Sequence, residues 1–320
     1  MPLHEDLYRL LYKIAQAYYL DGLTQQQIAK RFNLSRPKVS RLLQQARDEK
    51  IVNITLVPPS GSLAGLENTL EDQYGLDEVI LVPVSDPADT GEVARRLGPP
   101  AGEYLLRSLH DHDTLALAWG TTLSAAVNAL PCRSWNHLTI VQMIGGLGPD
   151  DSNEHSAELV RRAARRLQAQ FRLVRAPGIV ATTAAAKALR ADPQIADTLE
   201  HAARADFALV GLGVLSPGTV LRQSGTILGE NDLALLKQSG AAGDIILRFL
   251  DEQGAPLGLD INKRIIGLTL EQLKKIPRVA GVAGGTAKYK IIRAALRGRW
   301  LNVLITDQQT GERLAADRDG

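Results

Sequence analysis

Cysteine, aromatic residues and long apolar runs are all scarce in this 320-residue chain. A single cysteine, Cys132, excludes an internal disulfide and a zinc site built from several cysteines. Only four Phe and three Trp are present, so the core must be mostly aliphatic. No apolar run approaches the roughly 20 residues that span a bilayer, and the N-terminal MPLHEDLYRL lacks the apolar segment of a signal peptide. We therefore expect a cytoplasmic globular protein.

Acidic residues are absent from residues 24–47, which carry six Lys or Arg. The net charge of the whole chain is only +2, but residues 1–57 hold nine basic against five acidic side chains. The remainder holds 28 basic against 30 acidic side chains. A basic N-terminal segment on a slightly acidic remainder is typical of proteins that bind nucleic acid.

The basic segment has the pattern of a helix-turn-helix. Apolar residues at helical spacing predict a first helix over 6–20. Thr24 and Gln27 have the spacing of a capping box for a short second helix. Ser35 caps a third helix, with Pro37 in its first turn, where a missing N–H is tolerated. This arrangement predicts that the third helix enters the major groove of DNA. The alternative is a charged helical face that contacts only water.

The residue types on the polar faces suggest how DNA is contacted. Arg or Lys side chains at the start of the third helix suit guanine, and Gln44 suits adenine. The second helix is better placed to contact phosphates, with Lys30 and Arg31 as additional cations. The predicted DNA-binding residues are Thr24, Gln25, Ser35, Arg36, Lys38, Ser40, Arg41 and Gln44.

A domain boundary follows the basic segment. The β-branched run IVNITLV (51–57) predicts the strand of a small wing, and PPSGS (58–62) predicts a linker. We therefore expect a winged helix-turn-helix domain over residues 1–57 and a larger domain over residues 63–320.

From residue 63 onward, apolar runs of strand length alternate with helical patterns. The predicted strands are 78–84, 114–119, 138–143, 171–174, 206–212, 244–250, 278–284 and 302–306. The predicted helices are 63–74, 101–110, 121–130, 155–169, 183–203, 230–238, 269–275 and 286–297. Such alternation predicts a doubly wound, mostly parallel α/β sheet with helices on both faces. Ligands of these sheets bind beyond the carboxyl ends of the strands.

Glycine-rich turns follow several of these strands. Gly120-Thr121-Thr122 opens a helix, where N–H groups and hydroxyls suit a phosphate. Gly145-Gly146 allows close approach of a ligand to the backbone. Residues 284–288 (GGTAK) enter another helix and end in a lysine. Each turn alone is common in α/β proteins without a ligand, but together they favour a small anionic ligand.

Several stretches resemble the SorC-type (SorC/DeoR) bacterial transcriptional regulators over nearly the whole chain. In the basic segment these are GLTQQQIAKRFNLSRPKVSRLLQQAR and IVNITL. In the larger domain they are LAWGTTLSAAVNAL, VQMIGGLG, ADFALVGLG, GAAGDIILRFLD and VAGGTAKYKIIRAALRG. The resemblance implies a domain similar in fold to sugar-phosphate isomerases and glucosamine-6-phosphate deaminase. It also implies a phosphorylated sugar as effector, operator DNA as partner, and a homo-oligomer, typically a tetramer, that controls a carbohydrate operon.

The same resemblance assigns roles to the glycine turns. Gly120, Thr121 and Thr122 would hold the phosphate, and Lys288 would add charge. Gly145 and Gly146 would pass close to the sugar, and Asp244 would bond its hydroxyls. Some members of the family have Lys or Arg directly before the Gly-Gly pair, where this chain has Ile144, so a Schiff base is excluded there. Gln142 is available to a neutral hydroxyl, which favours an uncharged, singly phosphorylated sugar. We expect a regulator, with repression slightly favoured over activation.

An enzyme is the competing interpretation, because the larger domain resembles isomerases and deaminases. Such an enzyme needs a carboxylate base and an acid or His for ring opening. The stretch GLGVLSPGTVLRQSG (211–225) contains no Asp, Glu or His, which argues against a sugar-phosphate isomerase or deaminase with a DNA-binding appendage. The same stretch lacks the third glycine of a dinucleotide site, and the six histidines lack metal-ligand spacing. We predict no cofactor and no metal. RRAARR (161–166) is either a solvated face, a subunit contact or, less favoured, a second nucleic-acid patch.

Overall fold

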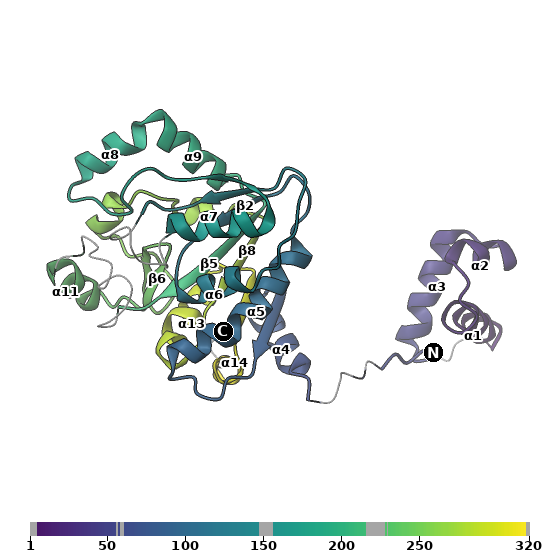
Figure 1. The fold of residues 1–320 in the computed structure, drawn as a ribbon. Coiled ribbons are helices and arrows are strands. Elements are labelled where there is room, and N and C mark those ends of the chain that lie inside the picture. Colours follow the sequence, from purple (N-terminus) through teal and green to yellow (C-terminus); the bar gives the residue numbers. More distant parts are fainter. Residues whose placement is uncertain are drawn as a thin grey trace. The chain divides into compact units, whose positions relative to one another are not determined.

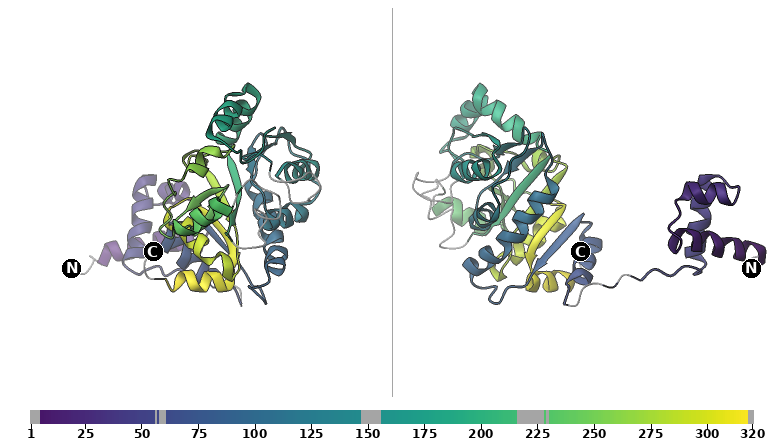
Figure 2. Two further views of the ribbon diagram at one scale, coloured as in Figure 1. Left: turned by 90° about the vertical axis from the view of Figure 1, so that its left-hand side faces the viewer. Right: turned by 45° about the vertical axis from the view of Figure 1, so that its right-hand side comes forward.

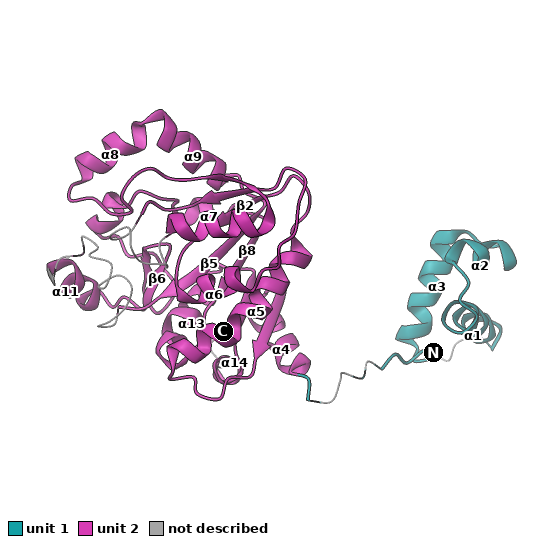
Figure 3. Ribbon diagram, in the orientation of Figure 1, with its two compact units in different colours: residues 1–62 teal, residues 63–320 magenta. Residues whose placement is uncertain are grey.

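The computed structural model describes residues 5–55, 57, 61–146, 156–215, 228 and 230–317 (Figure 1). The chain divides into two units, residues 1–62 and residues 63–320, which Figure 3 colours separately. Each unit has a hydrophobic core of its own.

The first unit contains three helices, α1 (Glu5–Tyr19), α2 (Gln25–Arg31) and α3 (Arg36–Asp48). The capping box forms as predicted: Gln27 N donates to Thr24 Oγ1 at 3.3 Å, and Thr24 N donates to Gln27 Oε1 at 2.8 Å. Ser35 Oγ accepts from Lys38 N at 3.4 Å at the start of α3. The core of this unit is a buried aliphatic cluster of Leu11, Ile14, Ala15, Ala17, Ile28, Ala29, Val39, Leu42, Leu43 and Ala46. The predicted helix-turn-helix is therefore present.

The wing strand predicted over residues 51–57 is wrong. Residues 51–55 and 57 are not in a strand, and the described part of the first unit offers no second strand with which to pair. Ile51 and Val52 pack against the helical core although they are adjacent in sequence, whereas Ile54 and Val57 are exposed. The alternating β-branched residues of this segment therefore do not mark a half-buried strand.

The second unit is built on a parallel sheet, as predicted, with strand order β1-β9-β8-β5-β2-β3-β4. The strands are β1 (Glu78–Val82), β2 (Thr114–Leu117), β3 (Thr139–Gln142), β4 (Gln170–Arg172), β5 (Phe207–Gly213), β8 (Arg278–Val282) and β9 (Val303–Asp307). Two short antiparallel strands, β6 (Gly243–Ile245) and β7 (Arg248–Leu250), extend from the end of β5. The strands are rich in buried Val, Ile, Leu and Ala, as expected of strands covered on both faces.

Helices cover both faces of this sheet (Figure 2). The described helices of this unit are α4 (Ala64–Tyr74), α5 (Thr90–Ser108), α6 (Thr121–Ala129), α7 (Ser156–Leu167), α8 (Thr183–Ala191), α9 (Pro193–Ala203), α11 (Glu230–Gln238), α12 (Leu270–Leu273), α13 (Tyr289–Arg297) and α14 (Gln308–Ala315), with 3-10 turns η1 (Asp260–Arg264) and η2 (Thr286–Lys288). Helices α5, α6 and α7 pack side by side, while α13 packs against β5, β6 and β7. Among the described residues, no helix is long and apolar enough to cross a membrane.

The single strand predicted over residues 244–250 is instead the hairpin β6–β7. Ile246 and Leu247 form its turn with φ of 49° and 64°, which no strand permits. A β-branched residue at positive φ is unusual and strained. Both side chains are buried, and Asp244 Oδ2 accepts a hydrogen bond from Leu247 N at 2.9 Å. Tertiary packing and this hydrogen bond therefore hold a turn that local sequence preference does not favour.

Two helix predictions also differ from the structure. The helix expected over 101–110 begins at Thr90 and continues through Pro99 and Pro100. Close packing against α6 accompanies this longer helix. A methyl group at Gly98 would lie 2.7 Å from Ala125 Cβ of α6, so glycine lets the two helices approach closely. The helix expected over 183–203 is broken by Asp192, whose carboxylate caps α9, and by Pro193, which begins it.

Candidate functional site

The polar face of α3 is exposed and carries unpaired cations. Ser35, Arg36, Lys38, Ser40, Arg41 and Gln44 are all exposed. In the described part of the chain no carboxylate lies within ion-pair distance of Arg36, Lys38 or Arg41. Gln44 Nε2 donates to Asp48 Oδ1 at 2.9 Å, so the amide must leave that partner before it bonds a base.

The two contact regions predicted for DNA meet at a hollow of about 630 Å³. It lies between the end of α1, the start of α2 and the start of α3, and is lined by Tyr18, Gly22, Leu23, Thr24, Gln25, Gln26 and Arg36. The start of α2, four hydroxyl or amide side chains and one guanidinium therefore line one concave surface. Such a surface fits a phosphate of the DNA backbone.

In the second unit, the strand order reverses between β2 and β5. The chain leaves β2 toward β3 and β4, but it leaves β5 toward β8 and β9 on the other side. Ligands of open α/β sheets bind in the crevice at such a switch point, beyond the carboxyl ends of the strands. Gly120 follows β2, and Gly213 ends β5 beside Asp244 of β6. Two predicted site segments thus flank the switch point.

Gly120 caps α6 in a conformation that glycine alone adopts easily, with φ 134° and ψ 161°. No side chain caps this helix, and a methyl group at Gly120 would meet no described atom within 4 Å. The hydroxyl-bearing Thr121 is exposed, whereas Thr122 is buried. The first N–H groups of a helix have no intrahelical acceptor, so α6 presents open donors and the positive end of its dipole at the switch point.

Neighbouring helices hold α6 in place. Gly98 of α5 packs against Ala125, Arg162 Nη2 donates to Ser124 Oγ at 2.9 Å, and Arg166 Nη1 donates to Leu130 O. The other two arginines of RRAARR form ion pairs with Glu158. All four arginines of this run therefore have partners within the chain, and two of them fix α6.

Asp244 is 4% exposed, and its two oxygens differ. Oδ2 accepts the hydrogen bond from Leu247 N, whereas Oδ1 has no hydrogen-bond partner among the described residues. A side chain at position 213 would collide with Oδ1, so glycine is required there. Burial raises the pKa of Asp244 to about 6, although the Leu247 N–H and the charge of Lys288 oppose this. A buried carboxylate with one open oxygen suits a ligand hydroxyl.

Lys288 lies near Asp244, and two backbone N–H groups of its loop already have acceptors within the chain. Burial lowers the pKa of Lys288, and the Asp244 carboxylate opposes the shift. Gly285 N donates to Asp307 Oδ2 at 2.6 Å, and Thr286 N donates to Pro87 O at 3.1 Å. These N–H groups are occupied, and η2 is a single 3-10 turn. The contribution of this loop is therefore the Lys288 ammonium rather than backbone donors.

The Gly145-Gly146 pair is bound to neighbouring chain segments. A methyl group at Gly145 would lie 2.5 Å from Ala176 O, so packing against residues 176–177 is sufficient reason for glycine. Gly146 N donates to Ala176 O at 2.9 Å and Gly146 O accepts from Gly178 N at 2.6 Å. Gly146 is only partly buried.

Gln142 is fully buried at the end of β3. Its Oε1 accepts from Val174 N at 3.0 Å, which connects β3 to the segment after β4. Its Nε2 has no hydrogen-bond partner among the described residues.

A small apolar cluster connects the parts of the site. Trp119, which directly precedes Gly120, packs in a cluster with Ile144, Ile179, Leu247 and Ile265. A methyl group at Gly211 would lie 3.3 Å from Trp119 O, so β5 also contacts this turn. The structure thus brings the turn before α6, the Asp244 hairpin and the Gly145 segment together. The sequence pattern gave no signal for Trp119 or Leu247, because Trp and Leu are usual residues of a hydrophobic core.

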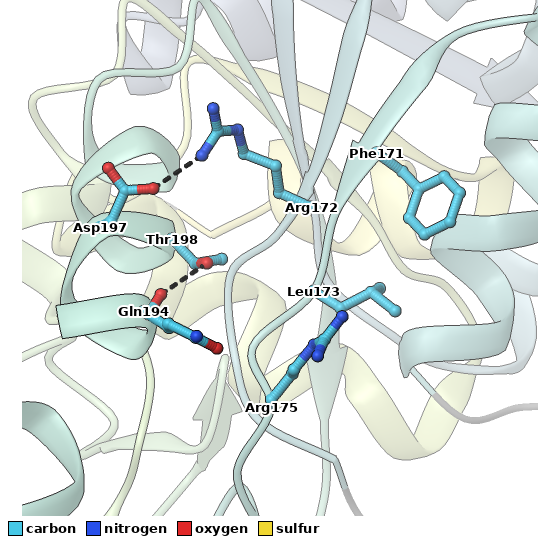
Figure 4. Close-up of a pocket in the computed structure, with 7 residues that line it drawn as sticks. All are labelled: Phe171, Arg172, Leu173, Arg175, Gln194, Asp197 and Thr198. Carbon is cyan, nitrogen blue, oxygen red and sulfur yellow. Dashed lines mark hydrogen bonds and ion pairs between the residues drawn. The ribbon is translucent and has the colours of Figure 1, made fainter. Parts of the chain in front are cut away.

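The edge strand β4 carries a separate cavity of about 380 Å³. Figure 4 shows its lining residues, Phe171, Arg172, Leu173, Arg175, Gln194, Asp197 and Thr198. Arg172 Nη1 bonds Asp197 Oδ2 at 2.7 Å across it. None of the predicted site residues is among the described residues that line this cavity. In the described ranges, no group of three or more His, Cys, Asp or Glu is arranged to hold a metal ion.

Comparison with known proteins decides the family. Residues 59–316 match the family described as "Putative sugar-binding domain", and residues 13–49 match "Sigma-70, region 4", a helix-turn-helix. The chain is 34% identical over 309 residues to the deoxyribonucleoside regulator of Bacillus subtilis, which covers 97% of this chain and 98% of that protein. The chain belongs to the SorC/DeoR-type transcriptional regulators with this sugar-binding domain.

Further members of the SorC/DeoR-type regulators agree over the full length. The sorbitol operon regulator of Klebsiella pneumoniae is 30% identical over 316 residues, 97% of this chain and 99% of that one. The crystal structure of full-length SorC from Klebsiella pneumoniae superposes with a TM-score of 0.73 at 28% identity, covering 97% of this chain and 100% of that chain. The relatives and structural neighbours are named transcriptional regulators, so the prediction of a regulator rather than an enzyme is confirmed.

Proposed function

We propose that this regulator is a cytoplasmic repressor of a carbohydrate operon, released from its operator by an uncharged, singly phosphorylated sugar. The observation that carries the effector assignment is the pairing of two chemistries at the β2/β5 switch point. An uncapped helix start at Gly120 offers donors to a phosphate, and the open Oδ1 of Asp244 offers an acceptor to a hydroxyl.

Within this proposal, each residue has a defined part. The N–H groups of Thr121 and Thr122 and the exposed Thr121 hydroxyl bind the phosphate, and Lys288 adds positive charge. Asp244 Oδ1 accepts a hydrogen bond from a sugar hydroxyl. Gly146, positioned by Gly145, lies beside the sugar. Gln142 Nε2, at the end of β3, donates a hydrogen bond to a second hydroxyl of the sugar.

DNA binding follows from α3. Arg36, Lys38 and Arg41 contact base edges, with Ser35, Ser40 and Gln44 beside them, while Thr24 and Gln25 bind a phosphate in the hollow. A single recognition helix makes few contacts, so a homo-oligomer, a dimer or tetramer, pairs two helices on a palindrome. The effector can alter operator binding only if the arrangements of the oligomer differ in their affinity for it.

The test is fluorescence anisotropy of the full chain on DNA upstream of its own operon, with scrambled DNA as control. The titration is repeated with a panel of monophosphorylated sugars. We expect specific binding that one sugar phosphate weakens. Specific binding that no sugar phosphate changes would refute the effector assignment and leave the DNA assignment intact.

Matched variants separate the two sites. Arg36→Ala or Arg41→Ala should weaken operator binding by roughly 1–3 kcal/mol for each lost base contact. Arg9→Ala is the control, because Arg9 lies on α1 and pairs with Glu5. Gly120→Ala, strained at φ 134°, should abolish the response to the sugar while leaving operator binding unchanged.

A further inference from the structure

A cavity of about 690 Å³ lies outside the proposed effector site, among α8, α9, η1 and the start of α12. Helices α8 and α9 form the corner of the second unit that is uppermost in Figure 1. The charged residues of the described lining are Lys187, Arg190, Glu200, Arg204, Arg248 and Lys263. Five of these side chains are cationic and one is acidic.

Two of the cations are guanidinium groups whose hydrogen-bond acceptors among the described residues are all backbone carbonyl oxygens. Arg248 is 7% exposed and donates to Leu268 O at 3.0 Å, Asn262 O at 2.6 Å and Gly267 O at 3.2 Å. Arg190, partly buried, donates to Lys263 O at 3.1 Å and to Ile265 O. A guanidinium has five N–H donors, so both groups retain donors after these bonds.

Neither guanidinium has a carboxylate partner. Within the described ranges, Glu200 pairs with Arg204 and Asp260 pairs with Lys263, but no carboxylate lies within 4 Å of Lys187, Arg190 or Arg248. Burial and the charge of nearby Arg190 lower the pKa of Arg248 to about 10, and the charge of Glu271 opposes the shift without reaching ion-pair distance. A buried and a partly buried cation that repel each other are stabilised by an anion, since buried charges are normally paired.

The rest of the lining indicates the body of the ligand. Ala196, Leu199 and Ala203 form an apolar wall along α9. A free inorganic anion would leave this wall in contact with water, whereas an anion with a short hydrocarbon body would cover it. The volume lies within the range of about 300–1,000 Å³ that is typical of small-molecule sites.

We propose that this cavity binds a small organic acid, with its carboxylate on Arg190, Arg248 and Lys187 and its apolar body against α9. Planar guanidinium groups match the two oxygens of a carboxylate. The site is separate from the switch point, but Arg248 directly follows Leu247 of the Asp244 hairpin, so the two sites share the β6–β7 element.

The test is isothermal titration of the full chain with hexanoate, with hexanol and inorganic phosphate as comparison ligands. Hexanoate should bind more tightly than either. Lys187→Glu and Ala196→Glu change exposed residues, so the protein should fold, and each should weaken hexanoate binding about tenfold by placing a negative charge beside the carboxylate. Arg190→Met should remove binding, but it also removes bonds to the backbone, so the exposed variants are decisive.

Controls locate the effect. Lys275→Glu reverses an exposed charge that does not line the cavity and should leave hexanoate binding unchanged, as should Gly120→Ala at the switch point. Equal binding of hexanoate and hexanol, tighter binding of phosphate, or equal affinities for Lys187→Glu and Lys275→Glu would each overturn the proposal.

Discussion

Replacing Asp244 by asparagine should stabilise the second unit at alkaline pH. The pKa of Asp244 rises from 3.8 to about 6 on folding, so the folded protein favours the neutral carboxyl. The neutral Asp244 carboxyl therefore stabilises the folded protein fully below pH 3.8, and this stabilisation is lost as the pH rises through about 6. At about 1.4 kcal/mol per pKa unit, the charged form costs the wild-type protein roughly 3 kcal/mol at pH 8.

The asparagine side chain does not ionise, but its amide oxygen can still accept the hydrogen bond from Leu247 N. The same two pKa values give a cost to the wild type of roughly 2 kcal/mol at pH 5. The free energy of unfolding of Asp244→Asn minus that of the wild type should therefore be larger at pH 8 than at pH 5, by about 1 kcal/mol.

Urea titration followed by tryptophan fluorescence measures this difference. Trp119, Trp135 and Trp300 all lie in the second unit, so the signal reports that unit and not the helix-turn-helix. A difference between variant and wild type that stays constant from pH 5 to pH 8 would refute the argument that burial raises the pKa of Asp244. The variant should also bind the sugar phosphate less tightly, because a neutral amide is a weaker acceptor than a carboxylate.

Three further predictions concern stability and salt. Gly145→Ala should lower the free energy of unfolding by roughly 1–3 kcal/mol in the same urea assay. The control Gly65→Ala, in a helix with open space around it, should raise the free energy of unfolding by about 0.4–1 kcal/mol. Equal effects of the two variants would contradict the close packing at Gly145. Ser35→Ala should destabilise the first unit by about 1 kcal/mol in thermal unfolding followed by circular dichroism, and Ser40→Ala, inside the same helix, should not. Lys30→Ala should reduce the slope of log affinity for the operator against log salt by about 1 if Lys30 contacts a phosphate.

The sequence predicted most of the architecture because its signals were local. The capping box of Thr24 and Gln27, the Ser35 cap and the alternating apolar runs of the second unit all depend on neighbouring residues. The hairpin at Ile246 and Leu247 could not be predicted in this way. Its positive φ values depend on the Asp244 hydrogen bond and on packing against Ile144, which lies about 100 residues away in the chain.

The sequence could suggest candidate residues for the effector site but not how those residues are arranged in space. Position after a strand made Gly120 a candidate, since parallel strands bring their carboxyl ends to one edge. Asp244 was a candidate only through the resemblance to the SorC/DeoR-type regulators. The acceptors of the N–H groups at 285–286 could not be predicted, because Pro87 and Asp307 come from distant segments of the chain. The cation cavity was missed for the same reason. Arg190 and Arg248 are 58 positions apart, and nothing local to either marks it as unpaired.

The firm hold on α6 has a consequence for how tightly and how selectively the regulator binds its effector. Gly98, Arg162 and Arg166 fix this helix from two neighbouring helices, so its N–H groups need little ordering when a ligand arrives. Binding then loses little conformational entropy, and even a small ligand with few contacts can bind well. The same stiffness limits adaptation to other ligands. If the phosphate of a ligand lies one carbon atom farther along the sugar, α6 cannot move to restore the hydrogen bonds. The distance between phosphate and hydroxyl should therefore discriminate among sugar phosphates more strongly than their overall size.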